Sequence, residues 1–373
     1  MEINQKIKQT RENMPVVEAI RQNFFDAQPF KGLTIGACLH ITKETAMLLM
    51  AIRDAGARVI ACASNPLSTQ DDVADYLRTY GNIEVHGKKG MTDEEYSDGL
   101  YKVSAVDPDY VIDDGADLTV VLLHRVGWQP KGGLEETTTG VNRIREMNLR
   151  YPILAVNDAD TKHLFDNVYG TGQSTLDGII RATNALLAGK TFVVAGYGNC
   201  GKGVAQRARG MGCNVIVTEI SPLKALQAHM DGFRVMTMEE AAPLGDIFVT
   251  VTGSRDVITK RHMNVMKSGV ILANAGHFDI EIDVPSAKEL GLNILADGRL
   301  VNLACAEGHP SEVMDMSFAN QLLGLDYLVK HASRMENRVH DIPKRIDEEV
   351  AELKAKALGI EYDIETPEQS EYR

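Results

Sequence analysis

The chain has 373 residues, of which 44% are hydrophobic and 24% charged, and its formal net charge is −13. That length exceeds one simple core and predicts two domains, and the composition gives no reason to expect long disordered tracts. The acidic balance argues against nucleic acid or an anionic membrane as the main partner, because both need a basic surface, and it favours a small molecule.

The chain contains 5 cysteines without a C-x-x-C pair, which is typical of reduced thiols in a cytoplasmic protein. The first residues are polar and charged, so no secretory signal is visible. No apolar run is long enough for a membrane-spanning helix. We therefore expect a cytoplasmic protein that does not bind a membrane.

The chain begins with a pattern of alternating helices and strands. Apolar spacing predicts a helix over 5–25, and residues 32–64 are typical of a strand, a turn, a helix and a second strand. The turn carries His40, Thr42 and Glu44. Because the carboxyl ends of parallel strands border the ligand crevice of α/β sheets, these three side chains are site candidates.

Helices are predicted over 71–79 and 92–106, and the strand that follows ends in a group of carboxylates, Asp113, Asp114 and Asp117. Three close carboxylates indicate a metal site or pKa values raised by like charges. A simple polar turn is an equally good interpretation, and we predict no bound metal.

Glu135 and Glu136 run directly into Thr137, Thr138 and Thr139. A threonine run before a helix can be a capping loop, or it can present hydroxyl groups to a cofactor. The residues themselves leave both interpretations open.

Lys162 and Asp166 follow the next strand and, four residues apart, share one face of a predicted helix. They form either a surface ion pair or, if Lys162 is desolvated beside a cofactor, a base with a depressed pKa. Residues 169–174 contain two glycines and precede a helix predicted over 175–187, so we expect the first hinge between domains there.

Residues 189–220 predict a strand, a glycine turn, a helix and a second strand that ends at Glu219. Gly196, Gly198 and Gly201 have G-x-G-x-x-G spacing, which permits a tight turn, lets the backbone approach a pyrophosphate and lets the helix pack on the strand. Glu219 is placed to accept both hydroxyls of an adenosine ribose and to repel a 2′-phosphate. The motif predicts NAD rather than NADP, and a glycine turn without a ligand is the weaker interpretation.

Asn274 and His277 follow a later predicted strand and face the same crevice. Residues 297–302 are the expected return hinge, and a helix over 312–332 should pack back on the first domain. A last helix begins at Pro343 and ends at Gly359, and the acidic tail beyond it is expected to be loose.

These motifs, in this order, resemble the S-adenosyl-L-homocysteine hydrolases, most closely their archaeal branch. The matched segments span nearly the whole chain: residues 38–42, 68–71, 113–117, 135–140, 157–167, 196–198, 274–279 and 308–311. The resemblance implies reversible hydrolysis of a nucleoside thioether, S-adenosyl-L-homocysteine, to adenosine and L-homocysteine with tightly bound NAD. In that family NAD oxidises the ribose 3′-hydroxyl, the 4′ proton is removed, homocysteine leaves, water adds, and the hydride returns.

The resemblance also implies a role for each matched residue. The implied catalytic residues are His40, Asp114, Glu136, Lys162, Asp166, Asn167 and His277. The implied substrate-binding residues are Thr42, Glu44 and His309 near the nucleobase, with Asp114, Glu136, Lys162 and Asp166 at the ribose. The implied cofactor-binding residues are Thr137, Thr138, Thr139, Asn167, Gly196, Gly198, Asn199, Cys200, Gly201, Glu219, Asn274, Ala275, Gly276, His277 and Asn302.

The expected fold is α/β, with two Rossmann-like doubly wound parallel-sheet domains joined by a two-segment hinge, and with a C-terminal helical extension. Residues 1–168 with 303–335 would bind substrate, residues 169–302 would bind NAD, and residues 336–373 would form the extension.

The sequence departs from the common family pattern at Thr171, Lys224 and Glu307, in a short link over 283–294, and in a chain end that lacks the family's lysine- and tyrosine-bearing tail. The resemblance implies a homo-oligomer, a tetramer or a dimer, and the altered end bears on that assembly and on cofactor affinity. Three alternatives stay open: the same chemistry on S-inosyl-L-homocysteine, a dehydrogenase that releases NADH, and a non-catalytic binding protein. The last is disfavoured because every matched catalytic position is kept.

Overall fold

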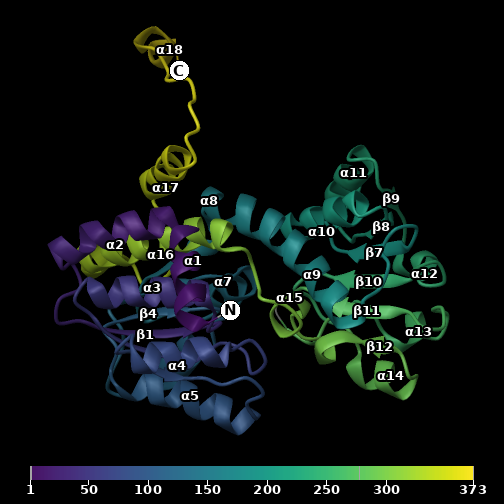
Figure 1. Ribbon diagram of the computed structural model, residues 1–373, viewed down its shortest axis with the longest axis horizontal. Coiled ribbons are helices and arrows are strands. Elements are labelled where there is room, and N and C mark those ends of the chain that lie inside the picture. Colours follow the sequence, from purple (N-terminus) through teal and green to yellow (C-terminus); the bar gives the residue numbers. More distant parts are fainter. Residues whose placement is uncertain (1, 277, 373) are drawn as a thin grey trace.

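The computed structural model describes residues 2–276 and 278–372, which form two lobes, each built on a parallel sheet (Figure 1). The first sheet has seven strands in the order β13-β6-β5-β4-β1-β2-β3, and the second has six in the order β12-β11-β10-β7-β8-β9. Counted from the first strand of each lobe, both contain the order 3-2-1-4-5-6 of dinucleotide-binding folds. The predicted class, α/β with two Rossmann-like doubly wound sheets, is confirmed.

The strands of the first sheet are β1 (Thr34–Leu39), β2 (Arg58–Ala63), β3 (Glu84–His86), β4 (Tyr110–Asp113), β5 (Gly132–Glu135), β6 (Ile153–Ala155) and β13 (Val339–Asp341). Those of the second are β7 (Thr191–Ala195), β8 (Asn214–Thr218), β9 (Arg234–Val235), β10 (Ile247–Thr250), β11 (Ile271–Asn274) and β12 (Asn293–Ile294).

The α-helices that precede β7 are α1 (Ile3–Glu12), α2 (Pro15–Ala27), α3 (Lys43–Asp54), α4 (Asp71–Thr79), α5 (Asp93–Ala105), α6 (Asp117–His124), α7 (Thr138–Arg145), α8 (Asp160–Lys162) and α9 (Thr171–Thr183). Those that follow are α10 (Asn199–Gly210), α11 (Pro222–Met230), α12 (Met238–Ala241), α13 (Lys260–Met263), α14 (Val284–Glu289), α15 (Val301–Ala304), α16 (Ser311–His331), α17 (Lys344–Ala357) and α18 (Pro367–Tyr372). Short 3₁₀ turns lie at Val156–Asp158, Leu295–Gly298 and Ala332–Arg334, and His163–Gly170 is a π-helix.

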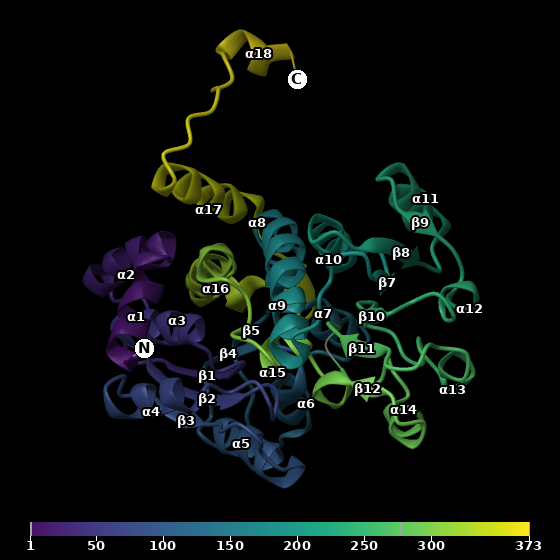
Figure 2. The same ribbon diagram turned by 45° about the vertical axis from the view of Figure 1, so that its right-hand side comes forward.

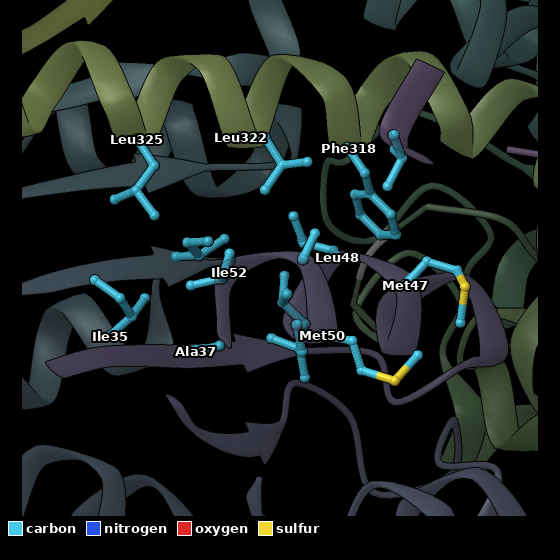
Figure 3. Packing of buried hydrophobic residues seen from close by; sticks show 14 of the residues in the cluster. Ile35, Ala37, Met47, Leu48, Met50, Ile52, Phe318, Leu322 and Leu325 are labelled. Atoms are coloured by element: carbon cyan, nitrogen blue, oxygen red, sulfur yellow. The ribbon is translucent and has the colours of Figure 1, made fainter. Parts of the chain in front are cut away.

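Helix α16 carries a central part of the core of the first lobe. Figure 3 shows Phe318, Leu322 and Leu325 pointing from α16 toward side chains of β1 and α3, among them Ile35 and Leu48. All five are at most 3% exposed. Since each such side chain contributes about 1.5–3 kcal/mol when it is buried, this face fixes the position of α16 firmly.

The N-terminal segment forms two helices, so the prediction of one helix over 5–25 is wrong. Helix α1 ends at Glu12 and α2 begins at Pro15. Proline has no backbone N–H and fits the first position of a helix, so it starts a new helix here instead of continuing the old one.

Residues 169–174, where we expect the first hinge, are helical, and Gly172 packs closely against a neighbouring helix. The π-helix runs without a loop into α9, so the helix begins before residue 175 and ends at Thr183. A Cβ atom at Gly172 would lie 2.7 Å from backbone of Gly203 in α10, and one at Gly203 would collide with the carbonyl oxygen of Val168. Glycine is therefore required for contact between these helices, and the sequence pattern alone did not distinguish this from a flexible turn.

The C-terminal segment joins the first lobe through a strand that the sequence pattern did not predict. Strand β13 has only three residues and pairs with β6 in parallel. Beyond α17, residues 358–372 are exposed, and α18 stands away from the rest of the chain in both views (Figure 1, Figure 2). None of the described helices is long and apolar enough to cross a membrane.

A buried ion pair anchors α17. Lys354 Nζ lies 2.8 Å from Asp315 Oδ2 of α16, and this carboxylate also accepts the backbone N–H groups of Val16 and Val17 at the start of α2. The exposed fractions of the two charged side chains are 9% and 0%. One carboxylate thus holds three helices together.

We expect Lys354→Met to lower the free energy of unfolding by about 3 kcal/mol, because loss of one partner leaves a buried carboxylate without its counter-charge. Urea denaturation of the full chain measures this. The matched control is Lys356→Met on the exposed side of the same helix, which should change stability by less than about 0.5 kcal/mol. Equal stability of the two variants would contradict the role given to the pair.

Candidate active site

A cavity of about 1170 Å³ is lined by residues that follow strands of both sheets. From the first lobe come the segments after β1, β4 and β5, and from the second come those after β7, β8 and β10. The predicted site residues that line it are His40, Thr42, Glu44, Asp114, Glu136, Thr137, Thr138, Thr139, Lys162, Asp166, Asn167, Gly196, Gly198, Asn199, Cys200, Glu219, Ala275, Gly276, Asn302 and His309.

Two of the predicted site residues that the structure describes, Gly201 and Asn274, are not in this wall. Gly201 packs behind the glycine turn, and Asn274 is fully buried. The side-chain amide of Asn274 is used internally, since it donates to the carbonyls of Phe278 and Gly298 and accepts from Gly276 N–H. His277 lies outside the described residues.

Lys162 is the centre of a buried polar cluster. Its Nζ donates to Asn167 Oδ1 at 3.0 Å and to Asn157 Oδ1 at 3.3 Å. It also lies 3.6 Å from Asp166 Oδ2 and 3.7 Å from Glu136 Oε1. Because these charged side chains are at most 7% exposed, the pair is not the surface ion pair that the spacing also allowed.

The expectation of a depressed pKa for Lys162 is wrong in this state of the protein. Burial lowers the pKa of Lys162, but the charges of Asp166, Glu136 and Asp114 outweigh it, so the pKa is raised. The sequence placed Lys162 beside Asp166 but did not reveal that Glu136 also reaches it. The ammonium therefore keeps its proton at neutral pH.

The two carboxylates around Lys162 have opposite shifts. Burial raises the pKa of Glu136 to about 8, although Lys162 works against it. Burial also disfavours ionised Asp166, but Lys162 and His309 outweigh it and lower the pKa. His309 Nδ1 lies 2.6 Å from Asp166 Oδ1, which places this histidine at the Lys162 cluster as well as at the cavity wall.

Glu136 lines the cavity and, within the described chain, has one carboxylate oxygen without a hydrogen bond. Gln321 Nε2 donates to Glu136 Oε2 at 2.5 Å, whereas the buried Oε1 atom has no hydrogen-bond partner among the described residues. A buried acceptor without a partner is costly, so this oxygen is suited to bind a hydroxyl group of a ligand.

His40 and Asp114 face each other across the ends of β1 and β4. His40 Nε2 lies 3.5 Å from Asp114 Oδ2, and Nδ1 contacts Ser68 Oγ at 2.7 Å. Burial lowers the pKa of His40 to about 3, and the nearby charge of His309 acts in the same direction. The imidazole of His40 is therefore neutral at neutral pH.

Thr42 and Glu44 lie at the start of α3. The Thr42 hydroxyl accepts the Thr45 N–H at 3.4 Å and so caps the helix. Glu44 Oε1 accepts the Ser311 hydroxyl at 2.6 Å and lies 3.1 Å from Lys43 Nζ. These contacts hold a buried carboxylate at the cavity wall.

The glycine turn after β7 has the shape that a dinucleotide needs. Gly196 has a φ of +106°, and a Cβ atom at Gly201 would collide with the Gly196 carbonyl oxygen. A Cβ atom at Gly198 would meet nothing within 4 Å, which leaves open space at the N-terminus of α10. Backbone N–H groups and the helix dipole favour a phosphate there.

Glu219 is held rigidly at the end of β8. Its Oε2 accepts the Tyr197 N–H at 2.7 Å, and its Oε1 accepts the N–H groups of Ile220 and Ser221 at 2.8 and 3.0 Å. The carboxylate thus ties the glycine turn to β8 and stays at the cavity wall, where lone pairs remain for ribose hydroxyls. Together with the turn, it fits NAD.

The threonine run belongs to the cavity rather than to a helix cap. Thr137 makes no side-chain capping bond to α7, and Thr138 Oγ1 donates to Asn157 Oδ1 at 3.0 Å. The buried Thr139 Oγ1 has no partner among the described residues, and its methyl group lies 3.2 Å from the Cβ position of Gly253 in the second lobe. This loop therefore meets the dinucleotide side of the cavity.

The carboxylates after β4 form a hydrogen-bonded turn. Asp113 accepts the N–H groups of Asp114 and Thr119, and burial raises its pKa to about 6. Asp117 pairs with Arg143 at 2.9 Å. Within residues 2–276 and 278–372, no group of three or more His, Cys, Asp or Glu is arranged to hold a metal ion.

Sequence reasoning missed the polar face of α16. Ser317 donates to Asp166 at 2.8 Å, Asn320 donates to Thr161 at 2.7 Å, and Gln321 supports Glu136. At the start of the same helix, the Ser311 hydroxyl donates to the Glu44 carboxylate. The available signal was a set of polar residues in an otherwise apolar helix, which indicates buried hydrogen bonds.

Two Rossmann-like lobes around one cavity, with a dinucleotide turn facing a buried lysine cluster, define an NAD-binding enzyme. Residues 3–131 match the family model of S-adenosyl-L-homocysteine hydrolase, and residues 167–294 match the NAD binding domain of S-adenosyl-L-homocysteine hydrolase. The chain belongs to the S-adenosyl-L-homocysteine hydrolase family.

Curated relatives match over nearly the whole chain. An adenosylhomocysteinase of Aquifex aeolicus is 54% identical over 98% of this chain and 94% of its own. An S-inosyl-L-homocysteine hydrolase of Methanocaldococcus jannaschii is 52% identical over 98% and 94%, and an adenosylhomocysteinase of Archaeoglobus fulgidus is 50% identical over 100% and 98%. The solved structure of a dipicolinate synthase from Bacillus halodurans shares the fold, with a TM-score of 0.54, 14% identity, and coverage of 82% of this chain and 100% of that chain.

We expect Gly201→Ala to reduce the NAD retained by the purified protein at least about tenfold, because the added methyl group collides with the Gly196 carbonyl and opens the turn. Release and quantification of bound dinucleotide measures this. Gly210→Ala at the other end of α10 is the control, since its Cβ atom meets nothing within 4 Å. Full NAD content in Gly201→Ala would contradict this account of the turn.

Proposed function

We propose that this chain hydrolyses S-adenosyl-L-homocysteine reversibly to adenosine and L-homocysteine with bound NAD. The observation that carries the proposal is that one cavity joins the dinucleotide turn of the second lobe to the buried Lys162 cluster of the first. Bound NAD supplies a hydride acceptor and donor. The residues of the chain bind the ribose, move protons and exclude water.

Lys162, Asp166 and Glu136 would hold the ribose hydroxyls. Oε1 of Glu136, which has no hydrogen bond in the part of the chain that the structure describes, lies 3.7 Å from Lys162 Nζ, so one hydroxyl can contact both groups. Because the flanking carboxylates raise the pKa of Lys162, it must first pass on a proton before it can accept one from the 3′-hydroxyl. Glu136, whose pKa burial raises to about 8 and whose Oε1 lies 3.7 Å from Lys162 Nζ, is the acceptor placed for that proton.

His40 and Asp114 would act on the other side of the ribose, in proton transfer at C4′ and at the 5′ sulfur or the incoming water. Their groups lie 3.5 Å apart at the cavity wall, and burial keeps His40 neutral. Positioned acid and base groups of this kind typically contribute about 10² to 10⁴ in rate.

We further propose a division of the chain into three parts, which membership of the family implies. Residues 1–168 with 303–335 bind substrate, residues 169–302 bind NAD, and residues 336–373 extend the first unit. The match of residues 167–294 to the family's NAD binding domain supports this division. We also propose a cytoplasmic homo-oligomer, for which the 5 free cysteines support a reducing compartment.

A second candidate is the same chemistry on S-inosyl-L-homocysteine. The 52% identity to an S-inosyl-L-homocysteine hydrolase favours testing it, because the two substrates differ only at the purine edge. A dehydrogenase that releases NADH is the remaining alternative.

We expect the purified protein to cleave S-adenosyl-L-homocysteine without net accumulation of NADH and to retain its dinucleotide, because the hydride returns to the product. Assays with both nucleoside thioethers, with liberated thiol and absorbance of reduced nicotinamide recorded together, measure this. A kcat/KM at least about tenfold higher for the inosyl compound would favour the second candidate. Stoichiometric NADH in solution would instead support the dehydrogenase.

We expect Lys162→Ala to lower kcat by about 10² to 10⁴, because it removes the group that holds and accepts the 3′-hydroxyl proton. Turnover, bound NAD and thermal unfolding are measured together. Lys330→Ala on the exposed side of α16 is the control and should keep full turnover. Near-normal turnover of the Lys162 variant would refute the assigned role.

A further inference from the structure

The first turn of the helix that carries Lys162 is capped from a distant part of the chain. Ala159 occupies the N-cap position of α8 and has no side chain that can cap it. Asp347 of α17 supplies the missing acceptor, since it accepts the N–H of Asp160 at 2.6 Å, the N–H of Thr161 at 2.9 Å and the Thr161 hydroxyl. A carboxylate satisfies the unpaired N–H groups of a helix start and interacts favourably with the helix dipole.

The capping carboxylate is itself firmly placed. Ile346 and Val350 of α17 are 5% and 0% exposed and pack in the core of the first lobe. One helical turn beyond Val350, Lys354 pairs with the buried Asp315. Thr161 is held from the other side, because Asn320 of α16 donates to its hydroxyl at 2.7 Å. Thr161 is thus fixed between α17 and α16, and Lys162 is the next residue.

We propose that Asp347 is a positioning residue for Lys162, an inference that rests on the proposed function of this site. Two partners of Lys162, Asp166 and Asn167, lie on the helical segment that continues from α8, whereas Asn157 and Glu136 lie on neighbouring segments. A shift of the first turn therefore changes the distance from Lys162 Nζ to Asn157 and Glu136. Of the described residues that line the cavity, none belongs to α17, so Asp347 acts only through the helix it caps.

The test compares Asp347→Ala and Asp347→Asn with the control Glu348→Gln, which changes an exposed residue on the same helix. The full-length enzyme with its retained NAD is mixed with adenosine, and absorbance of the reduced nicotinamide follows the first hydride transfer. KM for S-adenosyl-L-homocysteine and bound NAD are measured in parallel. A misplacement of about 1 Å can cost roughly 10²-fold in rate.

We expect Asp347→Ala to slow reduction of bound NAD at least about tenfold, while KM and NAD content stay within about threefold of the wild type. Asp347→Asn should be intermediate, because its amide oxygen still accepts one N–H. Glu348→Gln should match the wild type.

Wild-type rates in Asp347→Ala would overturn the proposal. Parallel loss of rate, NAD and substrate affinity would overturn it as well, since it indicates general structural damage. If Asp347→Ala does not fold, Asp347→Asn decides, and an unchanged rate in that variant overturns the proposal. A wild-type enzyme that neither cleaves the thioether nor reduces its NAD with adenosine refutes the proposed function itself.

Discussion

The burial of the Lys162 ammonium is the constraint on which the site depends. An ammonium ion removed from water costs several kcal/mol unless charges and hydrogen bonds replace its hydration. Here two amide oxygens at 3.0 and 3.3 Å and two carboxylates at 3.6 and 3.7 Å do so. These groups come from the ends of β5 and β6 and from the π-helix, so the charge can be accommodated only when the first sheet is correctly assembled.

Helix α16 connects that requirement to the core. Its apolar face packs against β1 and α3 (Figure 3), and its polar residues donate to Asp166 and Glu136. Core packing is tight and holds the apolar side chains of α16 in fixed positions. The hydrogen-bond donors on the polar face of the same helix are therefore also held in fixed positions. The same helix carries Asp315, which holds α2 and α17. Helix α16 therefore contributes both to the stability of the first lobe and to the geometry of the site.

Local patterns predicted the parts of this structure that depend on local geometry. The glycine turn, the strand before it and Glu219 were all recognisable, because each requirement acts within about one βαβ unit. The raised pKa of Lys162 was not, since Glu136 and Asp114 from other strands add to the effect of Asp166. Gly172 was interpreted as part of a turn, because the close approach of Gly203 is a tertiary contact that the sequence pattern does not contain. Strand β13 was missed because three residues are too few for a periodic pattern.

The charged groups around Lys162 come from segments that lie far apart in the chain. Although burial disfavours both charges, Lys162 and Asp166 are both charged at neutral pH, because each raises the stability of the other's ionised form, so the pKa of Lys162 is raised and that of Asp166 is lowered. His309, which contacts Asp166 at 2.6 Å, lies on the segment that returns from the second lobe after α15. That return passes through Ala296 and Asp297, whose φ angles of +52° and +50° are unfavourable for residues with side chains and persist only where the surroundings enforce them. His309 thus reaches Asp166 from the segment that connects the second lobe to α16.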